Sequence, residues 1–445
     1  MPPSFQRLNS MHRSILQIAL PSIVSNITVP LLALVDTAIV GHLGSPAYIA
    51  AIALGGMIFN MVYWLFGFLR MGTGGLTAQT YGAGDVLASH RLLGRSLLVG
   101  GAFSLLLWVL QVPILHTVFC FVPAEPEVRQ LAATYFRILI WGAPAVLGLY
   151  SLVGWFLGMQ RAKLPMLIAI VQNVVNILAS LFLVCVLGWK VEGVALGTLL
   201  AQYAGLLLAL WLWRTRFERP EPTLHTWRTL LRDRASFVAF FQVNRDIFLR
   251  TLCLIAVTVS FTSFGSAQGE LTLAANTLLM QFFLLFSYIM DGFAYAGEAL
   301  GGRYYGARDT LRFARLHRSL LLWGSALALL FTLGYGFGGS VLLRLLTDEV
   351  SVIAQASHHL SLICAMPFIG FAAFLYDGLY IGTTSTRYML LTMVLATLLF
   401  FGLYALLPPA NTSLWLAFLT YLGCRSLVQA LYYPKVKQTV AHHNQ

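Results

Sequence analysis

The sequence predicts an all-α membrane protein of twelve transmembrane helices, arranged as two six-helix lobes related by a parallel pseudo-two-fold repeat. Three observations carry this prediction: the composition, the number of long apolar segments, and a repeat within the chain. Of the 445 residues, 58% are hydrophobic and only 10% are charged, whereas a soluble domain carries about 25% charged residues. The mean hydropathy is +0.78. This composition excludes a soluble fold.

Twelve apolar segments follow one another along the chain, and a helix needs roughly 20 residues to cross a bilayer. The first six lie at 15–40, 48–79, 92–118, 130–158, 165–187 and 192–213, and the second six at 243–264, 272–301, 315–338, 355–382, 388–407 and 412–433. An arginine-rich stretch separates the two sets. We therefore expect an N-terminal lobe over 1–213, a cytoplasmic linker over 214–240, a C-terminal lobe over 241–433 and a cytoplasmic tail over 434–445.

Basic residues fall mainly on the two termini, the even-numbered connections and the linker. Those outside the linker are Arg7, Arg13, Arg91, Arg95, Arg161, Lys163, Arg308, Arg312, Arg315, Arg318, Arg387, Lys435 and Lys437. The odd-numbered connections hold little more than Arg129, Lys190 and Arg344. This asymmetry places both termini and the linker in the cytoplasm, because basic residues are retained on that side. It also explains the net charge of +12 without a nucleic-acid partner.

The two halves of the chain share short motifs at a constant spacing. YGAGD at 81–85 recurs as YGARD at 305–309, which is 224 residues later. The same offset relates Gly154 to Gly378, Gly158 to Gly382, and Lys163 to Arg387. An even number of spans in each half keeps the halves parallel, as in transporters whose site lies between two repeats; the alternative is a duplicated scaffold without transport. Asp85 and Asp309, which close the two motifs, are expected to cap helices or lie in loops.

The apolar run over 15–44 contains a single acid, Asp36, and two prolines, Pro21 and Pro30. A carboxylate at the bilayer centre costs on the order of 3 kcal/mol, so it normally faces a cavity or a partner. The alternative is that Asp36 merely reaches the far interface. The prolines remove helical hydrogen bonds and make this segment bendable. A bend that depends on the charge of Asp36 would be a two-state element driven by protonation.

Polar side chains in three other segments of the first half can surround Asp36. They are Tyr135 in the fourth segment, Asn173, Asn176 and Ser180 in the fifth, and Thr198 in the sixth. The three in the fifth segment have the spacing i, i+3, i+7, which puts them on one helix face. We expect a polar pocket around the acid. The alternative is that each amide or hydroxyl bonds a neighbouring helix, which is worth about 0.6 kcal/mol.

The second half has its own intramembrane acids, Asp291, Glu298 and Asp377, which are candidates for binding substrate. Asp291 and Glu298 are seven residues apart and so lie on one helix face. Arg70, in the second segment, needs an anion, and Asp291 or Asp377 is a plausible partner. The alternative for these residues is an internal ion pair without a role in transport.

No enzyme signature occurs in the chain: there is no Walker loop, HExxH, GxSxG or glycine-rich fingerprint after a strand. The five cysteines are scattered singly, which suggests neither a disulfide framework nor a zinc site. We therefore expect no catalysis, no cofactor and no resident metal. Without a nucleotide site, the energy for transport has to come from an ion gradient, worth about 2.3 kcal/mol per charge per 100 mV.

Four stretches carry a resemblance to a known family: ALPSIVSNITVPLLALVDTAIVGHLG, FLRMGTGGLTAQTYGAGD, NRDIFLR and MDGFAYAGEALGGRYYGARD. The chain resembles the multidrug and toxic compound extrusion (MATE) family over nearly its whole length, and within it the branch named for DNA-damage-inducible protein F. The resemblance implies twelve helices in two lobes that rock to give alternating access. It implies export of organic, often cationic and lipophilic, compounds from a bacterium across the inner membrane, by a monomer, against inflow of protons or sodium.

The resemblance also assigns roles to residues. Asp36 takes the place of the coupling carboxylate and Pro21 that of the hinge proline, while Tyr135, Asn176 and Thr198 match supporting polar positions. Relatives commonly carry Asn-x-x-x-Asp in the fifth segment, whereas here Asn176 is followed by Ser180. The lack of this second acid weakens a sodium site and favours protons as the coupling ion. Sodium binding at Asp36 stays the alternative.

A flippase for lipids or lipid-linked oligosaccharides is the alternative, because related folds have similar lobes. It would need a strongly basic cavity, whereas intramembrane arginine is sparse, with Arg70, Arg137 and Arg425 as the candidates.

Overall fold

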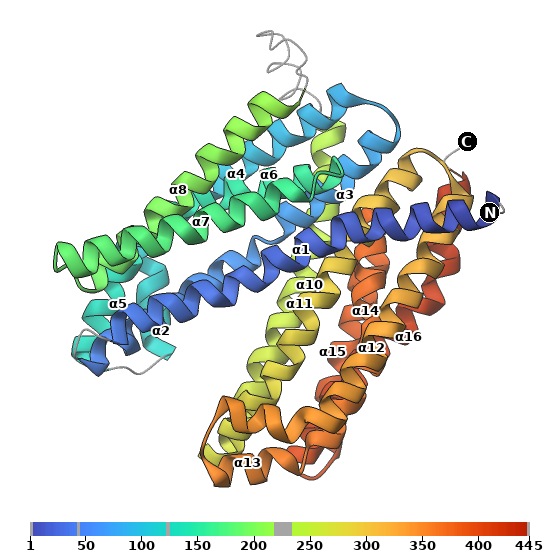
Figure 1. Cartoon of the computed structure of the whole chain (residues 1–445). Coiled ribbons are helices and arrows are strands. Elements are labelled where there is room, and N and C mark those ends of the chain that lie inside the picture. The colour runs from blue at the N-terminus through green and yellow to red at the C-terminus, as the bar shows by residue number, and fades with distance from the viewer. Residues whose placement is uncertain (1–2, 42–44, 122–124, 218–233, 443–445) are drawn as a thin grey trace. The chain divides into compact units, whose positions relative to one another are not determined.

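The computed structural model of the chain is helical, with no strand among the residues that the structure describes, which are 3–41, 45–121, 125–217 and 234–442 (Figure 1). The first half consists of α1 (Pro3–Gly41), α2 (Pro46–Leu65), α3 (Phe68–Gly82), α4 (Val86–Phe121), α5 (Pro126–Leu139), the 3-10 turn η1 (Ile140–Gly142), α6 (Ala143–Gly158), α7 (Lys163–Leu181), the π-helical turn η2 (Phe182–Val186) and α8 (Val191–Arg216). The second half consists of α10 (Arg234–Ala267), α11 (Glu270–Gly306), α12 (Thr310–Leu346), α13 (Val350–Ser357), α14 (Leu360–Gly382), α15 (Thr386–Leu406) and α16 (Asn411–His442).

Eleven helical segments in the described part of the chain are long and apolar enough to cross a membrane. They correspond in order to the second through twelfth predicted segments. The first predicted segment lies in α1, which at 39 residues is also long enough; some of its side chains are outside the described set. Residues 218–233, most of the predicted linker, are likewise outside it, and helix continues to Arg216 before them and starts again at Arg234 after them.

The chain divides into two compact units. The N-terminal unit comprises Val24–Thr80 and Asp85–Phe241, and the C-terminal unit comprises Gln242–Gln445 together with Met1–Ile23 and Tyr81–Gly84. Helix α1 therefore starts in the C-terminal unit and continues in the N-terminal unit, and the change falls two residues after Pro21.

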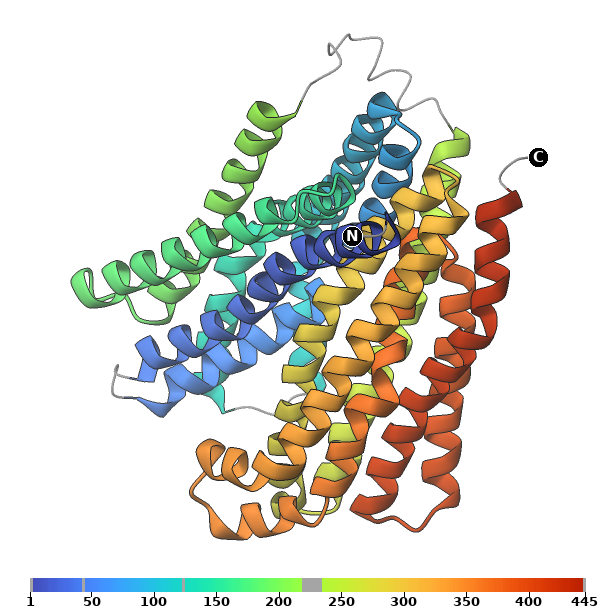
Figure 2. The ribbon, with the colours of Figure 1, turned by 45° about the vertical axis from the view of Figure 1, so that its right-hand side comes forward.

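Large side chains form the core of each unit. In the N-terminal unit, Trp155 and Phe156 of α6 are fully buried against side chains of α4, α7 and α8. In the C-terminal unit, Phe261, Phe282 and Trp415 belong to one cluster that joins α10, α11 and α16. Helix α14 packs against α11, α12 and α16, and the helices of this unit, yellow to red, run side by side in Figure 2.

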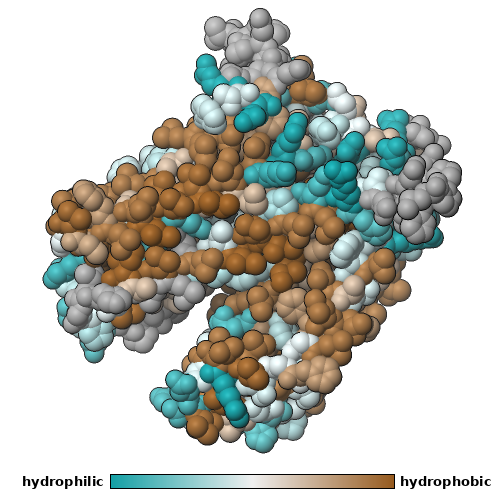
Figure 3. All heavy atoms as spheres, in the orientation of Figure 1, coloured by the Kyte–Doolittle hydropathy of each residue, from teal (hydrophilic) through white to brown (hydrophobic). Residues whose placement is uncertain are grey.

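The outer faces of the helices are apolar. Figure 3 shows hydrophobic residues along the sides of the helices and hydrophilic residues gathered at their ends. Many large apolar side chains are exposed, among them Val109, Phe337 and Leu431. A soluble protein rarely exposes so much contiguous apolar surface, whereas lipid solvates it at no cost.

The predicted repeat is confirmed by the helix boundaries. Helices of the first half that begin at residues 46, 86 and 126 have counterparts that begin at 270, 310 and 350, and the ends at Gly82 and Gly158 have counterparts at Gly306 and Gly382. Each of these pairs is 224 residues apart. The backbone agrees as well: positive φ angles occur at Gly84 (76°) and its counterpart Arg308 (57°), and at Gln160 (62°) and its counterpart Thr384 (53°).

The repeated glycines mark one repeated helix contact. A Cβ atom at Gly154 would lie 2.2 Å from the carbonyl oxygen of Arg70, and one at Gly378 would lie 2.1 Å from that of Ala294. Residues 70 and 294 are themselves related by the offset of 224. In each unit two helix backbones approach so closely that only glycine fits, as small residues allow in membrane bundles.

Several helices are interrupted where the sequence predicted single spans. The second predicted segment is divided by Phe66 and Gly67 into α2 and α3, and the fourth is divided by η1 into α5 and α6. Pro144 lies in the first turn of α6, where a missing N–H is tolerated, and Pro367 lies inside α14.

Candidate functional site

Asp36 of α1 is buried, with 7% of its surface exposed. Its Oδ1 atom has no hydrogen-bond partner among the described residues. Tyr135 of α5, also buried, is close enough for the two side chains to interact electrostatically. A Cβ atom at Gly55 of α2 would lie 2.4 Å from the Tyr135 ring, so the absence of a side chain there makes room for the tyrosine. The carboxylate thus has a polar neighbour and an oxygen that a proton or a cation could satisfy.

The predicted residues of α7 and α8 come together. Asn176 Nδ2 donates a hydrogen bond of 2.8 Å to Thr198 Oγ1, which donates to the carbonyl of Val194 at 3.0 Å. Asn176 and Ser180 are fully buried, and Asn176 Oδ1 and Ser180 Oγ have no hydrogen-bond partner among the described residues. A buried oxygen without a donor is costly. These oxygens are of the kind that hold a proton or a hard cation.

No hydrogen bond joins Asp36 directly to Tyr135, Asn176, Ser180 or Thr198 among the described residues. The fifth predicted segment reaches α1 at another place: Asn173 Nδ2 donates to the carbonyl of Thr28 at 3.1 Å. This bond fixes α7 to the part of α1 between the two prolines.

Pro21 is buried on α1, in the C-terminal unit. At the next residue, Ser22 Oγ donates to the carbonyl of Ile18 at 2.8 Å. A Cβ atom at Gly292 of α11 would lie 2.9 Å from the carbonyl of Ala19 and 2.4 Å from Ile23. The start of α1 is therefore held tightly against α11 on both sides of the proline.

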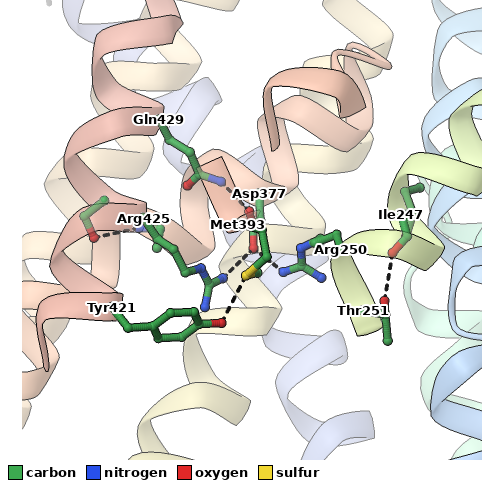
Figure 4. A network of polar contacts seen from close by, with 10 residues as sticks. Ile247, Arg250, Thr251, Asp377, Met393, Tyr421, Arg425 and Gln429 are labelled. Atoms are coloured by element: carbon green, nitrogen blue, oxygen red, sulfur yellow. Dashed lines mark hydrogen bonds and ion pairs between the residues drawn. The ribbon is translucent and has the colours of Figure 1, made fainter. Parts of the chain in front are cut away.

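Asp377 of α14 is the centre of a polar network in the C-terminal unit (Figure 4). Arg425 Nη2 donates to its Oδ2 at 2.8 Å, Gln429 Nε2 donates to its Oδ1 at 2.5 Å, and Arg250 donates to Oδ2. In Figure 4 the two arginines approach the carboxylate from opposite sides. They come from α10 and α16, so the network ties three helices together.

Asp377 was one of two acids suggested as a partner for Arg70, the other being Asp291, and the structure gives Asp377 other partners. Both carboxylate oxygens of Asp377 are occupied by side chains of its own unit, two of them guanidinium groups. Asp377 therefore forms an internal ion pair, which is the alternative given for these acids from the sequence. Arg70 itself is half-buried in the first turn of α3.

The two remaining acids lie on α11. Glu298 is 1% exposed, and Asp291 is half-buried and close enough to Tyr288 for an electrostatic interaction. Among the described residues, no group of three or more His, Cys, Asp or Glu side chains is arranged to hold a metal ion.

None of the three partners of Asp377 was predicted from the sequence: Arg425 was named only as an intramembrane arginine, and Arg250 and Gln429 were not singled out. A signal was present, because Arg250 lies in an apolar segment, where an arginine needs an anion. Arg425 and Gln429 are one helical turn apart. These features do not identify Asp377 as the partner, because Arg250 and Arg425 are 127 and 48 residues away from it in the sequence.

The chain has relatives of known family. The MatE family model matches it twice, over residues 21–182 and 247–405, once in each half. The chain is 36% identical over 421 residues to the DNA damage-inducible protein F of Escherichia coli (strain K12), which covers 94% of this chain and 91% of the relative. It is 28% identical over 345 residues to the human multidrug and toxin extrusion protein 1, covering 77% of this chain and 58% of that protein.

The fold has solved counterparts. An outward-facing structure of a multidrug resistance MATE family transporter of the MOP superfamily superposes with a TM-score of 0.86 at 20% identity, covering 97% of this chain and 96% of that one. That likeness establishes the two-lobed, twelve-helix architecture. Since the family model covers more than half of the chain and the E. coli relative is similar over almost all of it, this chain belongs to the MatE family of multidrug and toxin extrusion transporters.

Proposed function

We propose that the protein is a proton-coupled antiporter that exports organic, often cationic and lipophilic, compounds across the inner membrane of a bacterium. The observation that carries this proposal is the carboxylate of Asp36, buried on a transmembrane helix with one oxygen lacking a hydrogen-bond donor among the described residues. An ionisable group in that position marks an ion pathway by default. The family membership supplies the class of substrate.

In this proposal Asp36 takes up a proton from the periplasmic side while substrate is bound elsewhere in the transporter. Tyr135, Asn176, Ser180 and Thr198 support the charge changes from α5, α7 and α8. Sodium is the alternative coupling ion, because Asp36, Asn176 and Ser180 each present a buried oxygen without a described partner. The single carboxylate favours protons, since a sodium site prefers several hard oxygens and compensating charge.

Alternating access needs an element with two states, and we assign this role to α1. The helix passes from one compact unit to the other between Ile23 and Val24, and Pro21 and Pro30 each remove a helical hydrogen bond in that region. A change in the charge of Asp36 would alter the preferred bend of the helix that carries it. Both termini lie in the cytoplasm in this proposal, because the basic residues gather on that side.

The test is efflux of a cationic dye from everted membrane vesicles, with proton and sodium gradients imposed separately. Asp36→Asn keeps the shape of the side chain and removes its charge, so we expect export to be lost while the protein stays folded in the membrane. The matched control is Asp85→Asn: Asp85 Oδ1 caps α4 by accepting from the N–H of Ala88 at 2.8 Å, and asparagine can replace it as a cap. Normal export by Asp36→Asn would rule out the proposed coupling.

The same vesicle assay distinguishes the antiporter from the flippase alternative. A flippase requires a strongly basic site for a pyrophosphate, and two of the three buried arginines among the described residues, Arg250 and Arg425, are bonded to Asp377. Translocation of a fluorescent lipid without dye efflux would favour the flippase.

A further inference from the structure

A groove lies between the end of α4 and the start of α5, within the N-terminal unit. Its volume is about 500 Å³, which is within the range of ligand sites. The polar residues that line it are Gln111, His116, Arg129, Gln130, Thr134 and Arg137. This groove is separate from Asp36 and from the Asp377 network, and the proposed antiport does not use it.

Two arginines give the groove its charge. Arg129 and Arg137 are eight residues apart on α5, so they lie on one helix face about 12 Å apart along the axis. Neither has an ion pair among the described residues. The nearest acid of α5, Glu127, is not among the lining residues and acts electrostatically on Lys190 at the start of α8. Glu125, at the N-cap of α5, does not line the groove either. Among the described residues, the two guanidinium groups therefore have no carboxylate partner.

The guanidinium groups sit in a polar and partly aromatic frame. That of Arg129 lies 4.8 Å from the centre of the Phe119 ring, a cation–π contact that restricts it to the groove side of α5. Gln111 and Thr134 are oriented by hydrogen bonds to the carbonyls of Trp108 and Gln130, at 2.9 and 3.1 Å. Their remaining polar groups are available to a ligand.

The level of the groove in the membrane is marked by tryptophan. Trp108 and Trp141 contact each other with ring centres 4.8 Å apart, and Trp108 Nε1 donates to the carbonyl of Ile140 at 3.0 Å. Such tryptophans gather at the headgroup level. Helix α4 has 36 residues, hence a length of about 54 Å against about 30 Å of hydrocarbon, so part of it extends past the lipid tails. The residues that line the groove follow Trp108 on α4 and precede Trp141 in the next segment.

Basic residues are otherwise scarce at this end of the helices, because the positive-inside asymmetry removes them. Two unpaired arginines in one groove are an exception to that pattern and call for a ligand of opposite charge. Arginine binds phosphate oxygens with two parallel hydrogen bonds, which makes it the preferred residue for such groups. We propose that the groove between α4 and α5 binds a phosphate group, carried by the headgroup of an anionic phospholipid in the adjoining leaflet.

The experiment is native mass spectrometry of the full chain, released from micelles that contain phosphatidylglycerol or phosphatidylcholine at equal concentration. We expect the protein to retain phosphatidylglycerol in preference. The double variant Arg129→Gln/Arg137→Gln should hold it about thirtyfold more weakly, since each of the two basic residues contributes on the order of 1 kcal/mol near a lipid surface and about 1.4 kcal/mol is a factor of ten. Arg129→Lys/Arg137→Lys should restore most of the binding, because the charge returns.

Arg344→Gln is the matched control: Arg344 is exposed at the end of α12, on another odd-numbered connection, and does not line the groove. It should bind phosphatidylglycerol like the parent protein. In a third measurement, inorganic phosphate is added to the parent protein in micelles that contain phosphatidylglycerol. If phosphate at millimolar concentration displaces the lipid, the groove takes phosphate from solution; if it does not, the lipid is the source.

Equal retention of phosphatidylglycerol by the parent and the Arg129→Gln/Arg137→Gln variant would overturn the proposal, as would equal retention of the two lipids by the parent. Because both arginines are exposed, these variants should fold, and elution of a single symmetric peak on size exclusion verifies it. The readout is binding, so the result does not depend on whether the antiport proposal holds.

Discussion

Arg425 of α16 donates a hydrogen bond of 2.8 Å from Nη2 to Oδ2 of Asp377 on α14, and the two side chains are 4% and 8% exposed. A second guanidinium, that of Arg250 on α10, donates to the same oxygen. Three helices of the C-terminal unit are thereby joined at one carboxylate. The position related to Asp377 by the repeat is Val153, so the N-terminal unit repeats the helices without this network.

Replacing Arg425 with glutamine should destabilise the protein by about 3 kcal/mol, because removal of one partner leaves buried charge incompletely compensated. The measurement is the melting temperature in detergent. Arg344→Gln, at an exposed arginine, should change stability by no more than about 0.5 kcal/mol. Combining Arg425→Gln with Asp377→Asn should cost less than the two single changes added, since the residues are directly coupled. Equal melting temperatures for Arg425→Gln and Arg344→Gln would show that the ion pair contributes nothing.

Gly378→Ala should also destabilise the protein, by about 1–3 kcal/mol, because the added methyl group overpacks a rigid contact. Its Cβ would lie 2.1 Å from the backbone carbonyl of Ala294, which cannot move away without moving α11. Gly402→Ala is the control, since a Cβ there meets nothing within 4 Å and alanine favours a helix by up to about 1 kcal/mol. Thermal melts of the two variants should therefore shift in opposite directions. A shift of the same sign and size would mean that the close approach of α14 and α11 is not needed.

Asp309→Ala should cost about 1 kcal/mol through loss of a helix cap. The Asp309 Oδ1 atom accepts from the N–H of Arg312 at 2.8 Å at the start of α12. The same carboxylate also forms an exposed ion pair of 3.2 Å with Arg312, which is worth little in water. Asp309→Asn separates the two effects, because asparagine caps without charge. We expect its melting temperature to stay near that of the parent; a loss equal to that of Asp309→Ala would assign the effect to the ion pair.

Much of the fold follows from local sequence. Apolar runs predict spans because the bilayer requires each backbone polar group to be bonded within its own helix. The offset of 224 predicts matched boundaries in the two halves, and it also holds where the residue type differs, as at Gly84 and Arg308, which share a positive φ. The predicted capping role of Asp85 and Asp309 is confirmed by their bonds to the N–H groups of Ala88 and Arg312.

Partners across the fold could not be predicted in the same way. Helical periodicity gives the face on which Asp377 lies, but it does not say which of several neighbouring helices supplies the cation. Arg70 was a reasonable partner by charge alone, whereas Arg425 lies on α16, which packs against α14, and Arg250 reaches Asp377 from α10. The hydrogen bond from Asn176 to Thr198 depends likewise on the packing of α7 against α8, which no spacing in the sequence reveals.

Thr198→Val tests whether the polar residues of α7 and α8 support transport. Valine keeps the shape of threonine but removes the acceptor of the 2.8 Å hydrogen bond from Asn176, which leaves the buried amide free to turn away. Such bonds within membranes contribute about 0.6 kcal/mol on average, so the protein should stay folded. Dye efflux should fall about fivefold if the amide has to be held for coupling, which corresponds to about 1 kcal/mol.

The matched control is Thr258→Val on α10, whose hydroxyl donates only to the carbonyl of Leu254 in its own helix, at 2.9 Å. If Thr198→Val and Thr258→Val export dye equally well while Asp36→Asn does not, the coupling depends on Asp36 without help from the pair formed by Asn176 and Thr198.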